Sequence, residues 1–186
     1  MSDTVVPERA DATEPVALSA AFLLAVRRDE PTEALAATLA DLDGETLATR
    51  LDTDGARTAF WVNAYNATTQ RALAADPGRY ESRRQFFSSP LVTVAGEPLS
   101  LNDIENGILR RSHSMFTMGY VRTPGPLRDG FIERHAPDER DPRIHFALNC
   151  AADSCPPIPA YTREELDSQL DPATRGSRGR HVPSDP

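Results

Sequence analysis

The segment from about residue 55 to 75 constrains the fold most, because it has the pattern of one long helix that is apolar on nearly every side. Asp52 or Thr53 can cap its start, and the Asp-Pro-Gly sequence at 76–78 ends it. Trp61, the only tryptophan of the chain, lies within it. A helix without a broad polar face is unsuited to the surface, so we expect it to be buried at the centre of the fold.

Amide side chains form a stripe along this helix at Asn63, Asn66 and Gln70, with spacings of three and four residues. A buried amide without a hydrogen-bonding partner costs about 1–3 kcal/mol, so these groups need partners elsewhere in the chain. Two interpretations fit the stripe. Asn63 and Asn66 either bond neighbouring loops as structural groups, or they orient a catalytic side chain or a ligand.

Shorter patterns on both sides of the long helix predict further helices and strands. In chain order they are helices at about 15–28 and 32–42, a short element near 47–51, a strand at 91–94, a turn at 95–98, a return strand from 99, and helices at 101–111 and 162–170. Ser100 with Asp103, and Thr162 with Glu165, have the spacing of capping boxes at the starts of the last two helices. Residues 112–140 are expected to be irregular.

The stretch from Arg143 to Pro157 combines an alternating half with a stiff half. Ile144, Phe146 and Leu148 alternate with polar or small residues, which predicts a strand at 144–148. The two prolines at 156 and 157 remove backbone donors, so the second half is expected to be a rigid loop. Together these patterns predict an α+β fold with a helical N-terminal part and a central buried helix. That helix packs on a small mixed sheet containing 91–94 and 144–148.

The domain boundaries follow from where these patterns begin and end. Residues 1–14 are polar and expected to be flexible, and residues 172–186 are rich in Arg, Gly, Ser and Pro and expected to be disordered. We therefore predict a single domain over residues 15–171.

Both cysteines of the chain, Cys150 and Cys155, lie in the loop that follows the predicted strand, close to His145. Three chemistries fit this group. Cys155 can be a nucleophile with His145 as its base and Asn63 or Asn66 as the amide that orients the histidine. The cysteines and a histidine can bind a metal, although their spacing is at the edge of the usual range and a fourth ligand is not evident. The third possibility is that the cysteines only pack in the core.

Charge and composition exclude several function classes. The chain has a net charge of −8 and contains no lysine, and residues 1–55 carry 12 acidic residues against 4 arginines. This pattern indicates either a high-salt cytoplasm, where charges are strongly screened, or a genome that favours arginine codons. No basic stripe indicates a nucleic-acid surface, and no apolar run is long enough for a membrane span. Without a Gly-rich phosphate loop or a secretory signal, we expect a cytoplasmic protein that needs no cofactor.

Three motifs resemble the domain of unknown function 547 family. They are FWVNAYN at 60–66, GEPLSLNDIENGILR at 96–110 and DPRIHFALNCAADSCPP at 141–157, and they span about residues 55–162 with their flanks. The chain departs from the family at Ala151, where members usually have glycine, and it resembles a member shortened at its C-terminal end. The resemblance implies no defined activity, but plant members carry a coiled coil, which implies partner binding. Two functions are therefore expected as rivals, a thiol-dependent hydrolase or acyltransferase and a non-catalytic protein-interaction module.

Overall fold

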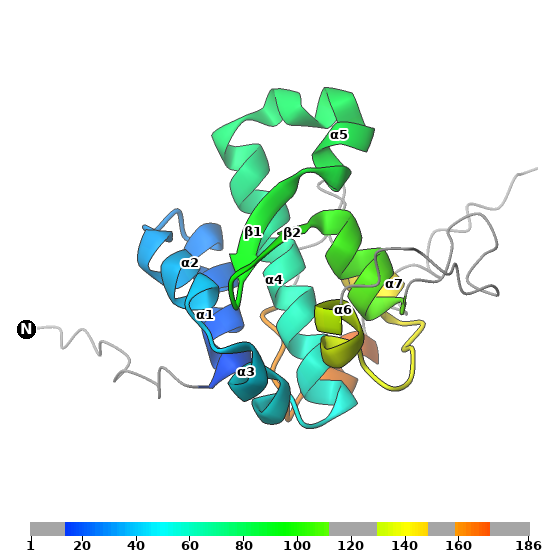
Figure 1. Ribbon diagram of the computed structural model, residues 1–186. Helices are drawn as coiled ribbons and strands as arrows, with labels where there is room; N and C mark the ends of the chain where they lie inside the picture. Colours follow the sequence, from blue (N-terminus) through cyan, green and yellow to red (C-terminus); the bar gives the residue numbers. More distant parts are fainter. Residues whose placement is uncertain (1–13, 112–129, 149–158, 172–186) are drawn as a thin grey trace, which may run out of the picture.

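The computed structural model describes residues 14–111, 130–148 and 159–171 (Figure 1). Its elements are α1 (Pro15–Arg27), α2 (Glu33–Ala40), α3 (Gly44–Arg50), α4 (Asp54–Ala75), a 3₁₀ helix η1 (Pro77–Ser82), α5 (Arg83–Ser88), β1 (Pro90–Val94), β2 (Glu97–Ser100), a π-helix η2 (Asp103–Leu109), α6 (Gly130–His135) and α7 (Ile144–Ala147). A last helical turn spans 166–171. The architecture is α+β, as predicted.

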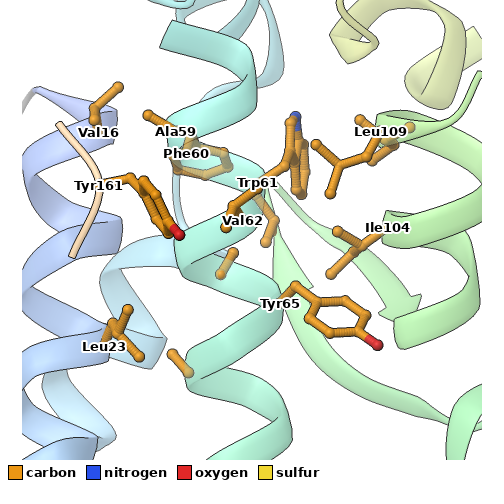
Figure 2. Close-up of a cluster of buried hydrophobic side chains, with 14 of the residues drawn as sticks. Val16, Leu23, Ala59, Phe60, Trp61, Val62, Tyr65, Ile104, Leu109 and Tyr161 are labelled. Atoms are coloured by element: carbon orange, nitrogen blue, oxygen red, sulfur yellow. The ribbon is translucent and has the colours of Figure 1, made fainter. Parts of the chain in front are cut away.

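Helix α4 is the central buried helix that the sequence predicts. The Thr53 hydroxyl caps it by accepting from the amide of Ala56 at 3.2 Å. Every residue from Thr58 to Thr69 is buried. Figure 2 shows that Trp61 and Tyr65 point from α4 toward η2, whereas the ring of Tyr161 lies between α4 and α1. Because α4 is buried on all sides along this length, it contacts both the N-terminal helices and the later segments.

The sheet is a two-stranded antiparallel hairpin of β1 and β2. Its two turn residues, Ala95 and Gly96, have φ angles of 49° and 79°, which are the positive values that a two-residue hairpin turn requires. Their amides donate to the carbonyls of Leu39 and Ala40 at 2.9 and 2.8 Å. The turn therefore caps the C-terminal end of α2 and holds the hairpin against the N-terminal helices.

The strand predicted at 144–148 is wrong, and this segment is the short helix α7. Burial there follows a spacing of three, because Ile144 and Ala147 are buried while Phe146 is 43% exposed. Arg143 precedes the first residue of α7, and its amide donates to the carboxylate of Asp141 at 2.8 Å. An apolar alternation of only five residues fits one helical turn as well as a strand, so the sheet lacks this third member and is not mixed.

Two other segments refine the predictions. Residues 130–135, expected to be irregular, form α6 with Ile132 and His135 buried. The capping box at Ser100 is confirmed, because the Asp103 carboxylate accepts from the Ser100 amide at 2.9 Å and the Asp103 amide donates back to the Ser100 hydroxyl at 3.1 Å. The predictions of a flexible N-terminus at 1–14 and a disordered tail at 172–186 concern residues outside the described ranges, with the exception of residue 14.

Candidate functional site

Asn63 is fully buried and binds the main chain of a segment far away in sequence. Its Oδ1 accepts from the amide of Tyr161 at 2.8 Å, and its Nδ2 donates to the carbonyl of Tyr161, also at 2.8 Å. The same Nδ2 lies 3.3 Å from the hydroxyl of Ser19 on α1. One side chain thus satisfies both backbone groups of Tyr161, as a neighbouring strand would.

Asn66 lies one helical turn further along α4 and is also fully buried. Its Nδ2 donates to the carbonyl of Ala147 at the end of α7, at 3.0 Å. Ala147 and Tyr161 stand on either side of residues 149–158, which contain Cys150 and Cys155 and lie outside the described residues. The two amides therefore fix the chain on both sides of the cysteine-bearing segment, which agrees with the structural interpretation of the stripe.

His145 is exposed on α7, and its polar partner in the described part of the chain is a guanidinium. Its Nδ1 lies 3.3 Å from Nη2 of Arg110, and its ring meets the ring of Phe146 edge-on at 5.3 Å. A guanidinium only donates hydrogen bonds, so Nδ1 is the acceptor in this contact.

Arg110 is itself held by an acidic side chain that reaches back to the central helix. Its Nη2 lies 2.8 Å from Oε1 of Glu105, while Oε2 of Glu105 accepts from the hydroxyl of Tyr65 at 3.0 Å. Tyr65 is only 2% exposed. A continuous polar chain thus leads from the core through η2 to the surface at His145.

Prediction from the sequence missed Tyr65, Glu105 and Arg110 for a geometric reason. The amide of Arg110 donates to the carbonyl of Glu105 at 2.9 Å, which is the five-residue spacing of a π-helix. In an α-helix, side chains three or four residues apart lie on one face, and those five apart do not. The one available signal was that Glu105 and Arg110 both lie in the motif at 96–110.

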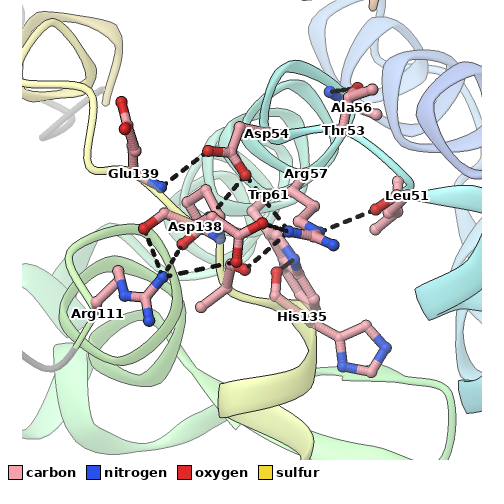
Figure 3. Close-up of polar contacts among 12 residues, drawn as sticks. Leu51, Thr53, Asp54, Ala56, Arg57, Trp61, Arg111, His135, Asp138 and Glu139 are labelled. Atoms are coloured by element: carbon pink, nitrogen blue, oxygen red, sulfur yellow. Dashed lines mark hydrogen bonds and ion pairs between the residues drawn. The ribbon is translucent and has the colours of Figure 1, made fainter.

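A second polar cluster fixes the chain between α6 and α7 to the start of α4 (Figure 3). The Asp54 carboxylate accepts from the consecutive amides of Asp138 and Glu139 at 2.6 and 2.8 Å. The guanidinium of Arg57 donates to the Asp138 carboxylate at 3.2 Å, and that of Arg111 donates to the Asp138 carbonyl at 2.7 Å. The bonds from Asp54 and Arg111 satisfy main-chain groups of a segment that lies outside α6 and α7.

His135 is buried in the same region and differs from His145 in its environment. Its Nδ1 lies 2.8 Å from the carbonyl oxygen of Phe131 and its Nε2 lies 3.3 Å from that of Gly44. Burial lowers the pKa of this imidazole, and the positive charges of Arg134 and Arg57 lower it further. The hydrogen bonds to the two carbonyls raise the pKa but do not outweigh these effects. The Trp61 indole donates to the His135 carbonyl at 3.2 Å, so this histidine is part of the packed core.

The metal interpretation depends on Cys150 and Cys155, which fall outside the described residues. Within the described ranges, no group of three or more His, Cys, Asp or Glu side chains is placed to hold a metal ion. The same part of the chain contains no helix that is long and apolar enough to cross a bilayer.

A family model described as "Protein of unknown function, DUF547" matches residues 49–176. The chain belongs to this family. The DUF547 match contains α4, both strands, η2, α6 and α7, and it includes the whole polar chain from Tyr65 to His145. It confirms the resemblance that the three sequence motifs indicate. No curated protein and no solved structure gave a match.

Proposed function

We propose that this DUF547 protein is a thiol-dependent hydrolase or acyltransferase in which Cys155 is the nucleophile and His145 its base. The observation that carries the proposal is the anchoring of both flanks of residues 149–158 by the buried amides of Asn63 and Asn66. A reactive loop needs such a rigid support, because catalysis depends on the position of the attacking atom. His145 is exposed two residues before one of these anchor points.

In this proposal Nδ1 of His145 is the proton acceptor. The S–H bond of Cys155 breaks, its proton goes to Nδ1, and the thiolate attacks the acyl carbonyl carbon of the substrate. The leaving group departs with the proton from Nδ1 and leaves a thioester on Cys155. Water or a second acceptor then cleaves the thioester, and the thiol is regenerated when the acceptor's proton returns through Nδ1 to sulfur.

Of the two roles considered for Asn63 and Asn66, the proposal uses the structural one. Each already uses its amide to hold a main-chain group, so we assign them as positioning residues for the cysteine-bearing segment. The enzyme would work in a reducing cytoplasm, because the nucleophile must stay a free thiol. The proposed chemistry uses no cofactor, since the thiol, the imidazole, the substrate and water or a second acceptor supply every bond that changes.

The test is the rate of alkylation of each cysteine by iodoacetamide as a function of pH. Cys150→Ser and Cys155→Ser variants separate the two thiols. An activated thiolate at Cys155 should titrate well below the free value of about 8.5, and His145→Gln should raise its midpoint. A burst of acyl-enzyme from an activated ester, absent in Cys155→Ser, would support the nucleophilic step.

A non-catalytic interaction module is the second candidate, and one observation favours it. Phe146 is an exposed large hydrophobic side chain on α7, beside His145. An exposed aromatic side chain is a typical anchor for a protein partner. If both cysteines react as unperturbed thiols and no acyl-enzyme forms, the interaction module replaces the enzyme.

A further inference from the structure

The polar chain from the core to His145 has a consequence for which ring nitrogen of this histidine holds a proton. We infer that Tyr65, Glu105 and Arg110 are positioning residues that keep the lone pair of His145 on Nδ1 and the proton on Nε2. The catalytic value of this arrangement rests on the proposed function, in which Nδ1 accepts the proton of the thiol. The arrangement itself can be tested without any reaction.

The tautomer of His145 follows from the bonding of one nitrogen, Nη2 of Arg110. Nη2 of Arg110 carries two hydrogens, and it lies 2.8 Å from Glu105 Oε1 and 3.3 Å from His145 Nδ1. These two hydrogens can serve the two acceptors, and a guanidinium nitrogen has no free lone pair that could accept a proton from Nδ1. A neutral ring with its proton on Nδ1 would place that hydrogen against the hydrogens of the guanidinium.

Glu105 fixes the guanidinium because both of its oxygens are engaged. Oε1 binds Arg110, and Oε2 accepts from the Tyr65 hydroxyl at 3.0 Å. The side chains of Glu105 and Arg110 are 18% and 24% exposed, so water weakens their ion pair less than it would at an open surface. Tyr65 belongs to α4 and is 2% exposed, which gives the chain a rigid end in the core.

The π-helical turn of η2 makes this arrangement possible. Its five-residue hydrogen bond places Glu105 and Arg110 one turn apart on the same face, where an α-helix would separate them. Gly107 lies inside the same turn, and a side chain there would come within 3.2 Å of Ile132 on α6. The close packing of α6 therefore supports the turn that aligns the carboxylate, the guanidinium and the imidazole.

This geometry prepares His145 to act as a base at Nδ1. The lone pair on Nδ1 faces the guanidinium of Arg110, and the proton on Nε2 lies on the other side of the ring. As an approaching thiol gives its proton to Nδ1, Arg110 releases that hydrogen bond but stays in place through Glu105.

The experiment is a long-range ¹H–¹⁵N correlation spectrum of the histidine side chains in the full-length protein at pH about 9, where imidazoles are neutral. His145→Gln identifies the His145 signals. We expect the Nε2–H form in the wild type, and in Arg110→Met a fraction of the Nδ1–H form that is about fivefold larger, because one hydrogen bond is lost. Arg110→Lys, which keeps a charged donor, should restore the wild-type ratio. Arg84→Met on α5 is the matched control and should change nothing.

An unchanged tautomer ratio in Arg110→Met would overturn the inference. If that variant does not fold, Glu105→Gln and Tyr65→Phe carry the same test, and a ratio equal to the wild type in both would also contradict it. The result is independent of cysteine reactivity. A shift of tautomer with unperturbed thiols would preserve the positioning role and remove the proposed function, whereas reactive Cys155 without a shift would do the opposite.

Discussion

Helix α1 and the segments at 130–148 and 159–171 both pack on α4, but they are held to it by different forces. The contact between α1 and α4 is largely apolar, because Val16, Phe22 and Leu23 of α1 are buried in the same core cluster as Ala59 and Val62 of α4. The later segments contribute short helices and turns, whose main-chain groups are bonded by polar side chains of α4. Helix α4 therefore supplies an apolar face to α1 and hydrogen-bonding partners to the later segments.

The reason lies in the length of the elements. Helix α1 has thirteen residues and satisfies most of its own backbone, so only its apolar face needs a partner. Helices α6 and α7 have six and four residues, which leaves many of their amides and carbonyls without intrahelical partners. Side chains from α4 meet this need at His135 of α6 and Ala147 of α7, and they also bond main-chain groups at Asp138 and Tyr161 outside these helices.

The largest effect is expected on the apolar side, from Phe22→Ala. Phe22 is fully buried, and the guanidinium of Arg71 lies over its ring at 5.3 Å. Removing the ring leaves a cavity, so the free energy of unfolding should fall by about 3–5 kcal/mol for the whole protein. Urea denaturation followed by circular dichroism measures it. Ala21→Ser, at an exposed position on the same helix, is the control and should change it little.

On the polar side, Asn63→Ala is expected to cost about 2–3 kcal/mol, because it leaves the buried amide and carbonyl of Tyr161 without partners. Urea denaturation measures the loss. Gln70→Ala, on the same stripe but only half-buried, is the matched control and should cost under about 0.5 kcal/mol. Equal losses in the two variants would mean that the amide bonds do not support the later segments.

Much of this division could be predicted from residues alone. The bounds of α4 to within one residue, a cap at Asp52 or Thr53 and its burial followed from a long apolar pattern with clear stop signals, and the structure has Thr53 as the cap. The need of Asn63 and Asn66 for partners also followed, because buried amides must be bonded. Which partners they bind did not follow, since Tyr161 and Ala147 are 98 and 81 residues away in sequence.

The failures occurred where local patterns are short. Three apolar residues over five positions gave the same signal for a strand and for α7, and burial at Ile144 and Ala147 decided for the helix. The π-helical register of η2 has no sequence signature that separates it from an α-helix, so the pairing of Glu105 with Arg110 was not predictable. The roles assigned to His145 and the two amides stay predictions, and the polar chain of Arg110, Glu105 and Tyr65 that leads to the imidazole was not predicted from the sequence.

A smaller effect is expected from pH, and it should act through His135. Burial lowers the pKa of this imidazole in the folded protein, so the unfolded chain binds a proton first as pH falls. The contribution of His135 to the free energy of unfolding should be fully present above the pKa of the histidine in the unfolded chain, about 6.5. It should be lost as pH falls toward the lower pKa of His135 in the folded protein. Urea midpoints at several pH values between about 8 and 5 measure this, above the range where carboxylates titrate.

His135→Gln provides the control for the pH dependence, because it removes the titrating group and keeps a polar side chain. The decrease between pH about 8 and 5 should become shallower in this variant. If the wild type and His135→Gln lose stability in parallel, another group is responsible and the buried histidine is not the cause.

The smallest effect is expected from salt, and it should act on the N-terminal region. Residues 1–55 carry 12 acidic residues and 4 arginines, so their self-repulsion opposes compaction and salt relieves it. Molar sodium chloride should raise the melting temperature, and more than an osmolyte such as sucrose, which favours burial without screening charge. Identical stability in low and molar salt would leave codon preference as the explanation for the absence of lysine.

Native-state hydrogen exchange can show whether polar side chains of α4 hold the later segments, because it measures the opening free energy of each region separately. We expect two cooperative units: amides in α1 and α4 exchange only by global unfolding, and those in 130–148 and 159–171 open together at a lower free energy. Asn63→Ala should lower the second value by more than the first. Equal opening free energies in both regions, falling equally in Asn63→Ala, would contradict the claim that polar side chains of α4 hold the later segments.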